Sequence, residues 1–343
     1  MRISLIKVMK MEEVKNGEIL LLYEAKNCNP NGDPDHDNRP RIDQATGINY
    51  VTDVRLKRFI RDYISNQYGE DYVFVNLHEG RHVTSDDRAK CFGIKTAEDA
   101  ANKFFDVRLF GVLIPERSET TKESSEKGGE KKGQEKKVKS VGSIALTGPV
   151  QFAWGYSLHP VEIIDFPRIT SIFQGRAASE TVAEAGTMGL DWRVYYSLIA
   201  FYGVISGKRA KVAHLENRDL MAFDNLLIQA LALEPTTRSK IPEKLLLYLR
   251  IEYSQEGFLI GDLRDFINVT SKQQIRKFTD LEIDFSPLLR VLTENKDKIK
   301  AIYLYQARFN KLEQELQKHF PEKLKRLPHP LSQEELKQIV LRK

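Results

Sequence analysis

The chain has 343 residues, 41% hydrophobic and 29% charged, which is enough apolar material for one large or two modest globular domains. No apolar run approaches the roughly 20 residues that span a bilayer, and residues 1–8 are too few and too charged for a secretory signal, so we expect a cytoplasmic protein with no membrane partner. Two cysteines exclude a disulfide framework and a multi-cysteine zinc site, while a net charge of +5 permits a polyanionic partner without requiring one.

The N-terminal part predicts a strand followed by an irregular loop. Residues 18–26 form a short Leu-rich run that is typical of a buried strand. Residues 27–43 then mix proline and glycine with asparagine and aspartate, the side chains that favour turns. This segment is therefore either a structured connection or a binding loop.

A helix is predicted from Thr52 onward. Its apolar side chains recur with helical spacing and fall on one face: Leu56, Phe59, Ile60 and Tyr63. The opposite face carries three cations, which we expect to project into solvent: Lys57, Arg58 and Arg61.

A break in composition follows. Residues 104–115 predict an extended or short helical core segment, whereas residues 116–140 consist of Lys, Glu, Ser and Gly with almost nothing to bury. Such a composition indicates a disordered insertion. Residues 143–164 return to strand character with paired or bulged strands, and a looser stretch follows from 165 to 188.

The second half continues with a strand at 191–206, a helix at 216–233, a strand at 244–253 and a charged amphipathic helix at 296–320. The order strand, helix, strands, helix, strand suits an α+β fold, with a ferredoxin-like sheet and helices on one of its faces.

The loop at 27–43 and the helix after it gather the donors that a phosphate backbone requires. Glycine and asparagine can expose backbone N–H groups, a helix N-terminus adds a positive dipole end, and arginine adds forked contacts. The cations involved are Arg39, Arg41, Lys57, Arg58 and Arg61. A charged helix face is usually only solvated, so the residues alone leave these two interpretations evenly matched.

Two metal patterns are weaker. Asp33, Asp35 and Asp37 alternate as in a calcium loop or a metal-dependent nuclease, but the sixth and twelfth positions lack the required Gly and Glu. The segment HEGRH at 78–82 matches a zinc-hydrolase motif, yet it contains a glycine and lacks an apolar helix face. Turn and capping roles fit the aspartates better, and no metal site is expected.

The remaining chemistry-bearing pattern is aromatic. Phe152, Trp154 and Tyr156 alternate, so all three are expected on one face of a strand, where they either pack in the core or stack on bases; the core is favoured. Glycine-rich phosphate loops are absent, and neither cysteine has the context of a nucleophile. We therefore expect no catalytic residues and no cofactor.

Five segments resemble the Cas7 family, the repeated backbone subunit of type I CRISPR surveillance complexes (Cascade), and are most similar to its type I-B (Csh-type) branch. They are NPNGDPDHDNRPRID, VTDVRLKRFIRDYI, DVRLFG, LTGPVQFAWGYSLH and MGLDWRVYYSLIAFYG, all between residues 27 and 203. The resemblance implies a modified RNA-recognition-motif (RRM) core with long insertions. It also implies several copies bound along one CRISPR RNA beside other Cascade subunits, presenting the guide to target DNA in antiviral defence.

The resemblance assigns roles to particular residues. Arg41, Lys57 and Arg61, with Arg58 beside them, would hold the guide phosphates, and Asn29, Asn31 and Arg39 would line the same groove. Residues 164–188 resemble the thumb that kinks the guide against a neighbouring copy. We expect an RNA-binding core over residues 1–255 and a mainly helical region over 256–343 that packs on it.

The resemblance also leaves one enzymatic alternative. Related backbone subunits of RNA-targeting CRISPR complexes cut target RNA with a loop aspartate, which would make this chain a metal-dependent ribonuclease using Asp33, Asp35 or Asp37. Backbone subunits of type I complexes leave cutting to a separate nuclease, so a non-enzymatic RNA-binding scaffold is the favoured interpretation.

Overall fold

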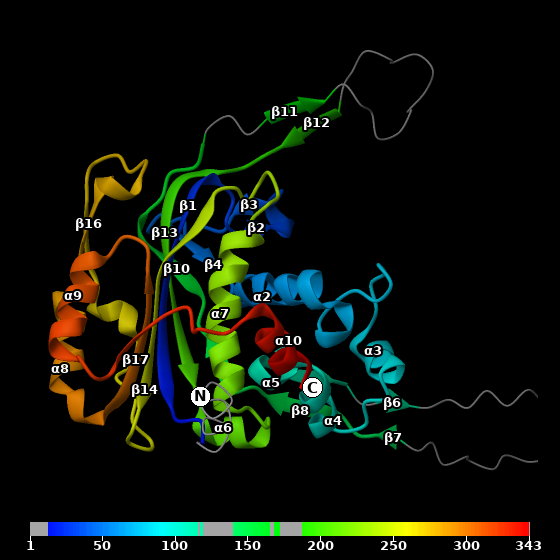
Figure 1. The fold of residues 1–343 in the computed structure, drawn as a ribbon. Helices are drawn as coiled ribbons and strands as arrows, with labels where there is room; N and C mark the ends of the chain where they lie inside the picture. The colour runs from blue at the N-terminus through cyan, green and yellow to red at the C-terminus, as the bar shows by residue number, and fades with distance from the viewer. Residues whose placement is uncertain (1–12, 116, 119–139, 165–167, 172–186, 343) are drawn as a thin grey trace, which may run out of the picture.

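The computed structural model describes residues 13–115, 117–118, 140–164, 168–171 and 187–342. A large sheet runs through its centre in the order β18-β17-β14-β1-β13-β10-β4, with β9 also paired to β13 (Figure 1). Neighbouring strands are antiparallel except for the parallel pair β17 and β18. The strands are β1 Gly17–Cys28, β4 Ile48–Val51, β9 Val150–Phe152, β10 Gly155–Pro160, β13 Val194–Ile205, β14 Glu243–Tyr253, β17 Ile299–Gln306 and β18 Leu324–Arg326.

The central strand β1 is buried on both faces. Ile19 and Leu21 belong to one hydrophobic cluster, whereas Leu20 and Leu22 belong to another on the opposite side of the sheet. A strand covered on both sides has no polar face, which explains its continuous apolar run. The strands predicted at 18–26, 191–206 and 244–253 are confirmed as β1, β13 and β14.

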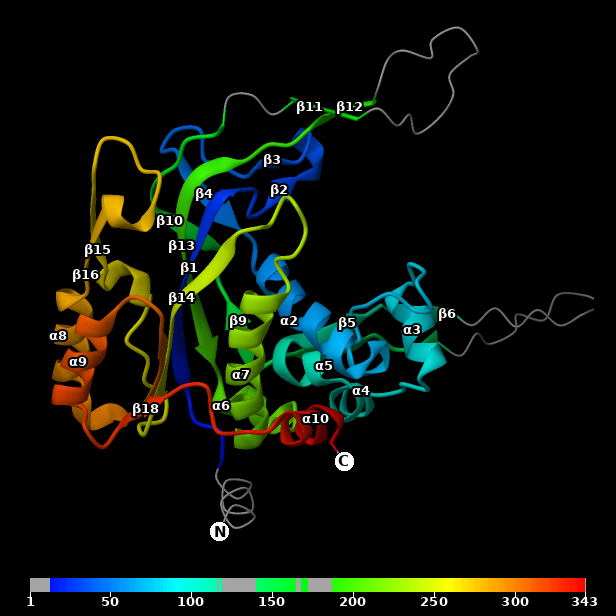
Figure 2. The same cartoon turned by 45° about the horizontal axis from the view of Figure 1, so that its top comes forward.

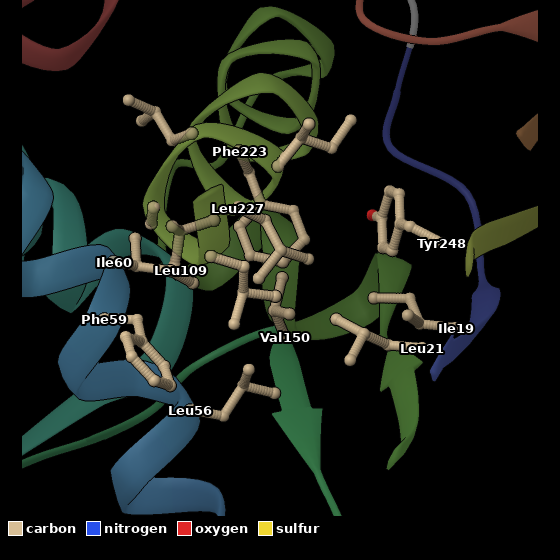
Figure 3. Packing of buried hydrophobic residues seen from close by; sticks show 14 of the residues in the cluster. Ile19, Leu21, Leu56, Phe59, Ile60, Leu109, Val150, Phe223, Leu227 and Tyr248 are labelled. Atoms are coloured by element: carbon tan, nitrogen blue, oxygen red, sulfur yellow. The ribbon is translucent and has the colours of Figure 1, made fainter. Parts of the chain in front are cut away.

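The first face of the sheet is covered by α2 Asp53–Tyr68 and α7 Asn217–Leu233, with α10 Gln333–Leu341 beside α7. Figure 3 shows Phe59 and Ile60 of α2, and Phe223 and Leu227 of α7, converging on this core. The apolar face predicted for α2 is confirmed, because all four of its residues are at most 2% exposed. The helix predicted at 216–233 is confirmed as α7.

The second face is covered as well, which the expectation of helices on one face missed. α8 Ser286–Glu294 and α9 Asn310–His319 pack there through Leu288, Leu292, Leu312 and Leu316 (Figure 1). A short hairpin, β15 Asn268–Ser271 with β16 Leu281–Asp284, precedes them. The sheet therefore lies between two helical layers.

Residues 256–343, predicted as a mainly helical region that packs on the core, also contribute strands to the central sheet. The helix predicted at 296–320 is wrong over its first half, because this stretch forms β17 before α9 begins. β17 pairs with β14 and thereby extends the central sheet. The strand itself carries one charge, Lys300, but charged residues flank it at 296–298 and at Arg308, so the segment as a whole has the charge density of an amphipathic helix.

A side unit packs against α2 around its own hydrophobic cluster. It comprises α3 Ser85–Cys91, α4 Ala97–Lys103, α5 Phe105–Phe110 and the antiparallel pair β5 Gly111–Ile114 and β8 Ile144–Thr147. α6 Gly207–Val212 joins β13 to α7 elsewhere. The low-complexity insertion starts from this pair: β6 Arg117–Ser118 pairs with β7 Ser140–Val141, and the rest of it lies outside the described residues.

A two-stranded arm leaves the sheet between β10 and β13. Its strands are β11 Arg168–Ser171 and β12 Thr187–Leu190, which pair antiparallel and extend away from the central sheet (Figures 1 and 2). The segment expected as a thumb, 164–188, overlaps this arm, but residues 165–167 and 172–186 lie outside the described part. Within the described residues, no helix is long and apolar enough to cross a membrane.

Candidate nucleic-acid interface

The loop at 27–43 follows β1 and is an ordered structure with its own short ladder, β2 Gly32–Asp33 against β3 Arg39–Pro40. Asn27, Asp37 and Asn38 have φ values of 51°, 52° and 56°. Asparagine and aspartate tolerate this left-handed conformation better than other side chains, so the composition of the loop serves its turns. The loop is thereby held in one shape at the end of the sheet.

The two predicted asparagines organise the loop. Asn29 is buried and its Nδ2 donates to the carbonyl oxygen of Asn38 at 2.6 Å. Asn31 Oδ1 accepts from the backbone N–H of Thr52 at 2.9 Å and from its hydroxyl at 3.1 Å. Both contacts tie the loop to Thr52, the residue that precedes the first turn of α2.

The two predicted loop arginines differ in their engagement. Arg41 Nη2 lies 3.2 Å from Asp33 Oδ1, and its side chain is partly covered. Arg39 is exposed, and its guanidinium lies 4.8 Å from the centre of the Trp192 ring. Among the described residues no carboxylate lies within ion-pairing distance of Arg39, so this cation is available to an anionic partner.

The three helix cations do not project into solvent as expected. Lys57 Nζ lies 2.9 Å from Asp53 Oδ2 with its side chain 10% exposed, and Arg61 Nε lies 2.9 Å from the fully buried Asp106 with 7% exposed. Arg58 pairs with Asp62 and donates to the carbonyl oxygen of Val75. α2 packs on the sheet and also against the side unit, so a helix with one apolar stripe is covered on two sides.

We predict that Arg61→Ala lowers stability rather than removing an exposed RNA contact. The free energy of unfolding should fall by about 2–3 kcal/mol, because a buried charged hydrogen bond is lost while Asp106 keeps two backbone N–H donors, from Phe74 and Val75. Urea denaturation measures this. Unchanged stability, together with weaker RNA binding by the folded protein, would contradict it. For the same reason, reversing all three helix charges would disturb the fold.

Among the three loop aspartates, Asp33 has its carboxylate engaged in the structure of the turn. Asp33 accepts from His36 Nδ1 at 3.0 Å and from the backbone N–H of Asp35, and these hydrogen bonds, with nearby Arg41, lower its pKa. No group of three or more His, Cys, Asp or Glu side chains in the described residues is arranged to hold a metal ion. The segment at 78–82 forms a turn with Glu79 at φ 50°. The ribonuclease alternative therefore has no support.

Sequence reasoning missed a group of cations that the fold brings to this loop. Lys240 Nζ donates to the carbonyl oxygens of Asn29 and Pro30 at 2.5 and 3.2 Å. Arg193 Nη1 donates to the carbonyl oxygen of Asn27 at 2.9 Å. Arg238, with a side chain 67% exposed, lies 3.7 Å from Asp191, which also pairs with Arg193. No local pattern marks them, since they stand at least 150 residues from the loop along the chain.

Two ionisable side chains at the base of the loop, Lys240 and Glu243, have pKa values shifted by burial. Burial lowers the pKa of Lys240, and burial raises the pKa of its neighbour Glu243. Both Glu243 oxygens are buried without a hydrogen-bond partner, and so is Asn29 Oδ1. Buried polar atoms of this kind are usually satisfied by internal water. The two hydrogen bonds from Lys240 to the carbonyl oxygens of Asn29 and Pro30 hold the base of the loop in position.

The comparisons with known proteins agree with the motifs in and around the loop. The family model described as CRISPR-associated protein Cas7 matches residues 15–286. A Haloferax volcanii protein described as CRISPR-associated protein Cas7 is 31% identical over 309 residues, which cover 86% of this chain and 87% of that protein.

Two solved structures are similar more distantly. A chain described as CRISPR RNA-guided surveillance complex has a TM-score of 0.47 and 12% identity, covering 95% of this chain and 98% of its own length. A second chain, described as CRISPR RNA-guided surveillance complex, pre-nicking, has a TM-score of 0.47 and 10% identity, covering 85% of this chain and 93% of its own length. The sequence matches decide the assignment: the chain belongs to the Cas7 family of CRISPR-associated proteins.

Proposed function

We propose that this chain is the CRISPR RNA-binding backbone subunit of a type I Cascade complex, of the I-B branch, in the cytoplasm. The observation that carries this is the match to the Cas7 family across the segment that builds the ordered loop at 27–43. Several copies assemble along one guide beside other Cascade subunits. Phosphate contacts supply affinity independent of sequence, and pairing of guide with target DNA supplies specificity, without catalysis by this subunit.

The fold proposal is a modified RRM core. The strand order β14-β1-β13-β10, with α2 and α7 on one face, is the fourth-first-third-second order of a ferredoxin-like unit and supports this interpretation. The modification is the second helical layer, α8 and α9, over the face that such a domain leaves open. The arm β11–β12 is proposed to belong to a thumb that contacts a neighbouring copy.

The site proposal follows from which cations around the loop keep part of their side chain accessible to a partner. Arg39, Arg41 and Arg238 contact guide phosphates. Asn29 and Asn31, with Lys240 and Arg193 below them, keep the loop in the shape that presents those cations. Lys57, Arg58 and Arg61 support the site indirectly. Their ion pairs hold α2 in place, and Thr52 at the start of α2 is hydrogen-bonded to Asn31 of the loop.

We predict steep salt dependence of RNA binding and no cleavage. The purified full chain is titrated with single-stranded RNA from 50 to 400 mM salt, while RNA integrity is followed on a gel with and without Mg²⁺ or Mn²⁺. Binding that weakens about 0.7 decades per decade of salt for each neutralised phosphate, with intact RNA and growing assemblies, supports the scaffold. Metal-dependent cleavage abolished by Asp33→Ala would instead establish a ribonuclease.

A further inference from the structure

A cluster of three aromatic side chains lies at one edge of the sheet, two of them exposed and the third, Tyr50, half-buried. Tyr50 and Trp154 stack with ring centres 5.7 Å apart and planes 9° apart, and Tyr156 lies 6.4 Å from Tyr50. Trp154 is 44% exposed and Tyr156 41%. Phe152 is not part of it, because β9 ends there and its side chain is buried in the core, so the expectation that three alternating aromatics share a face is wrong.

The cluster occupies the part of the second face that α8 and α9 leave uncovered. Tyr50 pairs with Tyr156 across β4 and β10, and Tyr156 pairs with Ala200 of β13. Paired residues of antiparallel strands point to the same face. Ala200 lies in the hydrophobic cluster beneath α8 and α9, so the three rings continue that face beyond the helical cover.

The rings are held in place from behind and from the side. Gly155, between Trp154 and Tyr156, lies against the Phe201 ring, and a Cβ at this position would come within 2.5 Å of that ring. Because Gly155 faces the core, its two neighbours point to the opposite face of the sheet. Arg264 borders the cluster: its Nη1 donates to the Trp154 carbonyl oxygen at 2.7 Å, and its guanidinium lies 5.2 Å from the Tyr156 ring centre. Asp262 fixes that guanidinium through both carboxylate oxygens.

The cluster is continuous with the phosphate-binding loop. The backbone N–H of Tyr50 donates to the carbonyl oxygen of Arg41 at 2.9 Å, and Asn49 Nδ2 donates to the same oxygen at 2.8 Å. Figures 1 and 2 both show β4 and β10 beside the loop strands β2 and β3. A single-stranded RNA whose phosphates contact Arg39 and Arg41 would therefore lie next to these aromatic rings.

We propose that Tyr50, Trp154 and Tyr156 form a stacking surface for nucleobases of the single-stranded RNA whose phosphates bind the loop. This inference rests on the proposed function. A parallel ring pair with an exposed outer face accepts a third ring in the same geometry, and every nucleobase offers such a face. A protein partner would need about 800 Å² of surface, more than three side chains provide. The surface adds affinity that is indifferent to base identity.

The test combines removal of the Trp154 ring with removal of the RNA bases, in the manner of a double-mutant cycle, and uses the full chain. Wild type, Trp154→Ala and Trp154→Phe are titrated with a single-stranded RNA and with an oligomer of equal length made of abasic ribose phosphate. Leu233→Ala, which truncates an exposed apolar side chain on α7, is the matched control, and thermal unfolding checks each fold. We expect Trp154→Ala to weaken RNA binding about tenfold without changing binding of the abasic oligomer, Trp154→Phe to restore most of the loss, and the salt slope to stay constant.

Any other outcome would contradict the proposal that these rings stack on nucleobases. Equal loss on both oligomers would mean that Trp154 acts only through the shape of the loop. Unchanged RNA affinity would mean that the rings meet no base, and that the cluster serves a protein contact or none. If wild type bound neither oligomer, the proposed RNA-binding function itself would fail, and that result is distinct from the other two.

Discussion

Replacing Asp224 with alanine is expected to lower the free energy of unfolding by about 3–5 kcal/mol, the largest stability effect we predict for this chain. Asp224 of α7 is fully buried and accepts from Arg250 Nη2 at 2.6 Å, Tyr248 Oη at 2.6 Å and His329 Nε2 at 2.8 Å. Its loss leaves the buried guanidinium of Arg250 without a counter-charge. It also removes the bond from the His329 side chain to α7, although Asn225 still holds the backbone of His329 through two hydrogen bonds.

Urea denaturation measures the effect, and Asp265→Ala is the control. Asp265 is an exposed aspartate, so its truncation should change stability by less than about 0.5 kcal/mol. A loss below about 1 kcal/mol for Asp224→Ala would show that the buried charge network contributes little to the free energy of unfolding.

The same carboxylate makes stability depend on pH. Burial alone would raise the pKa of Asp224, but the charge of Arg250 and the hydrogen bond from His329 outweigh it, and the net result is a pKa below the ordinary 3.8. A folded-state pKa that is lowered favours folding above the unfolded pKa, and this contribution is lost as pH falls through the folded value. The stability difference between wild type and Asp224→Ala should therefore be present at pH 5 and shrink below about pH 4, as the carboxylate of the folded protein takes up a proton.

Reversing the charges of Arg39 and Arg41 together is expected to reduce RNA affinity at least 100-fold at about 0.1 M salt, because two phosphate contacts become repulsive. The matched control reverses two exposed lysines on other helices, Lys318 of α9 and Lys337 of α10, which changes the net charge equally. Equal losses in both variants would mean that overall charge, rather than the loop, controls binding.

A milder variant separates lost contacts from a disturbed loop, since a glutamate at 41 would face Asp33. Arg39→Gln with Arg41→Gln removes the charges without repulsion and should lower the slope of log affinity against log salt by about 1.4, the value for two phosphates of a single strand. A slope that stays at the wild-type value would exclude both arginines as phosphate contacts, even if affinity fell.

The sequence by itself determined the family and those elements whose hydrophobic pattern is unambiguous. Burial on both faces makes β1, β13 and β14 continuous apolar runs, and the stripe Leu56, Phe59, Ile60 and Tyr63 marks the core face of α2. Both signals are local, because they depend on which side of one element is covered. The turn-forming residues at 27–43 likewise identified the loop and its place beside α2.

Only the tertiary structure decided which charges are free to bind a partner. Periodicity placed Lys57 and Arg61 away from the apolar stripe, but Asp106, 45 residues away, brings a counter-charge to Arg61 and buries it. The same folding carries Lys240 across 211 residues to the carbonyl oxygen of Asn29. A cation is available or neutralised according to the groups within a few ångströms, and those groups come from distant parts of the chain. For that reason the sequence located the loop, whereas the fold left Arg39 as a cation with no carboxylate partner among the described residues.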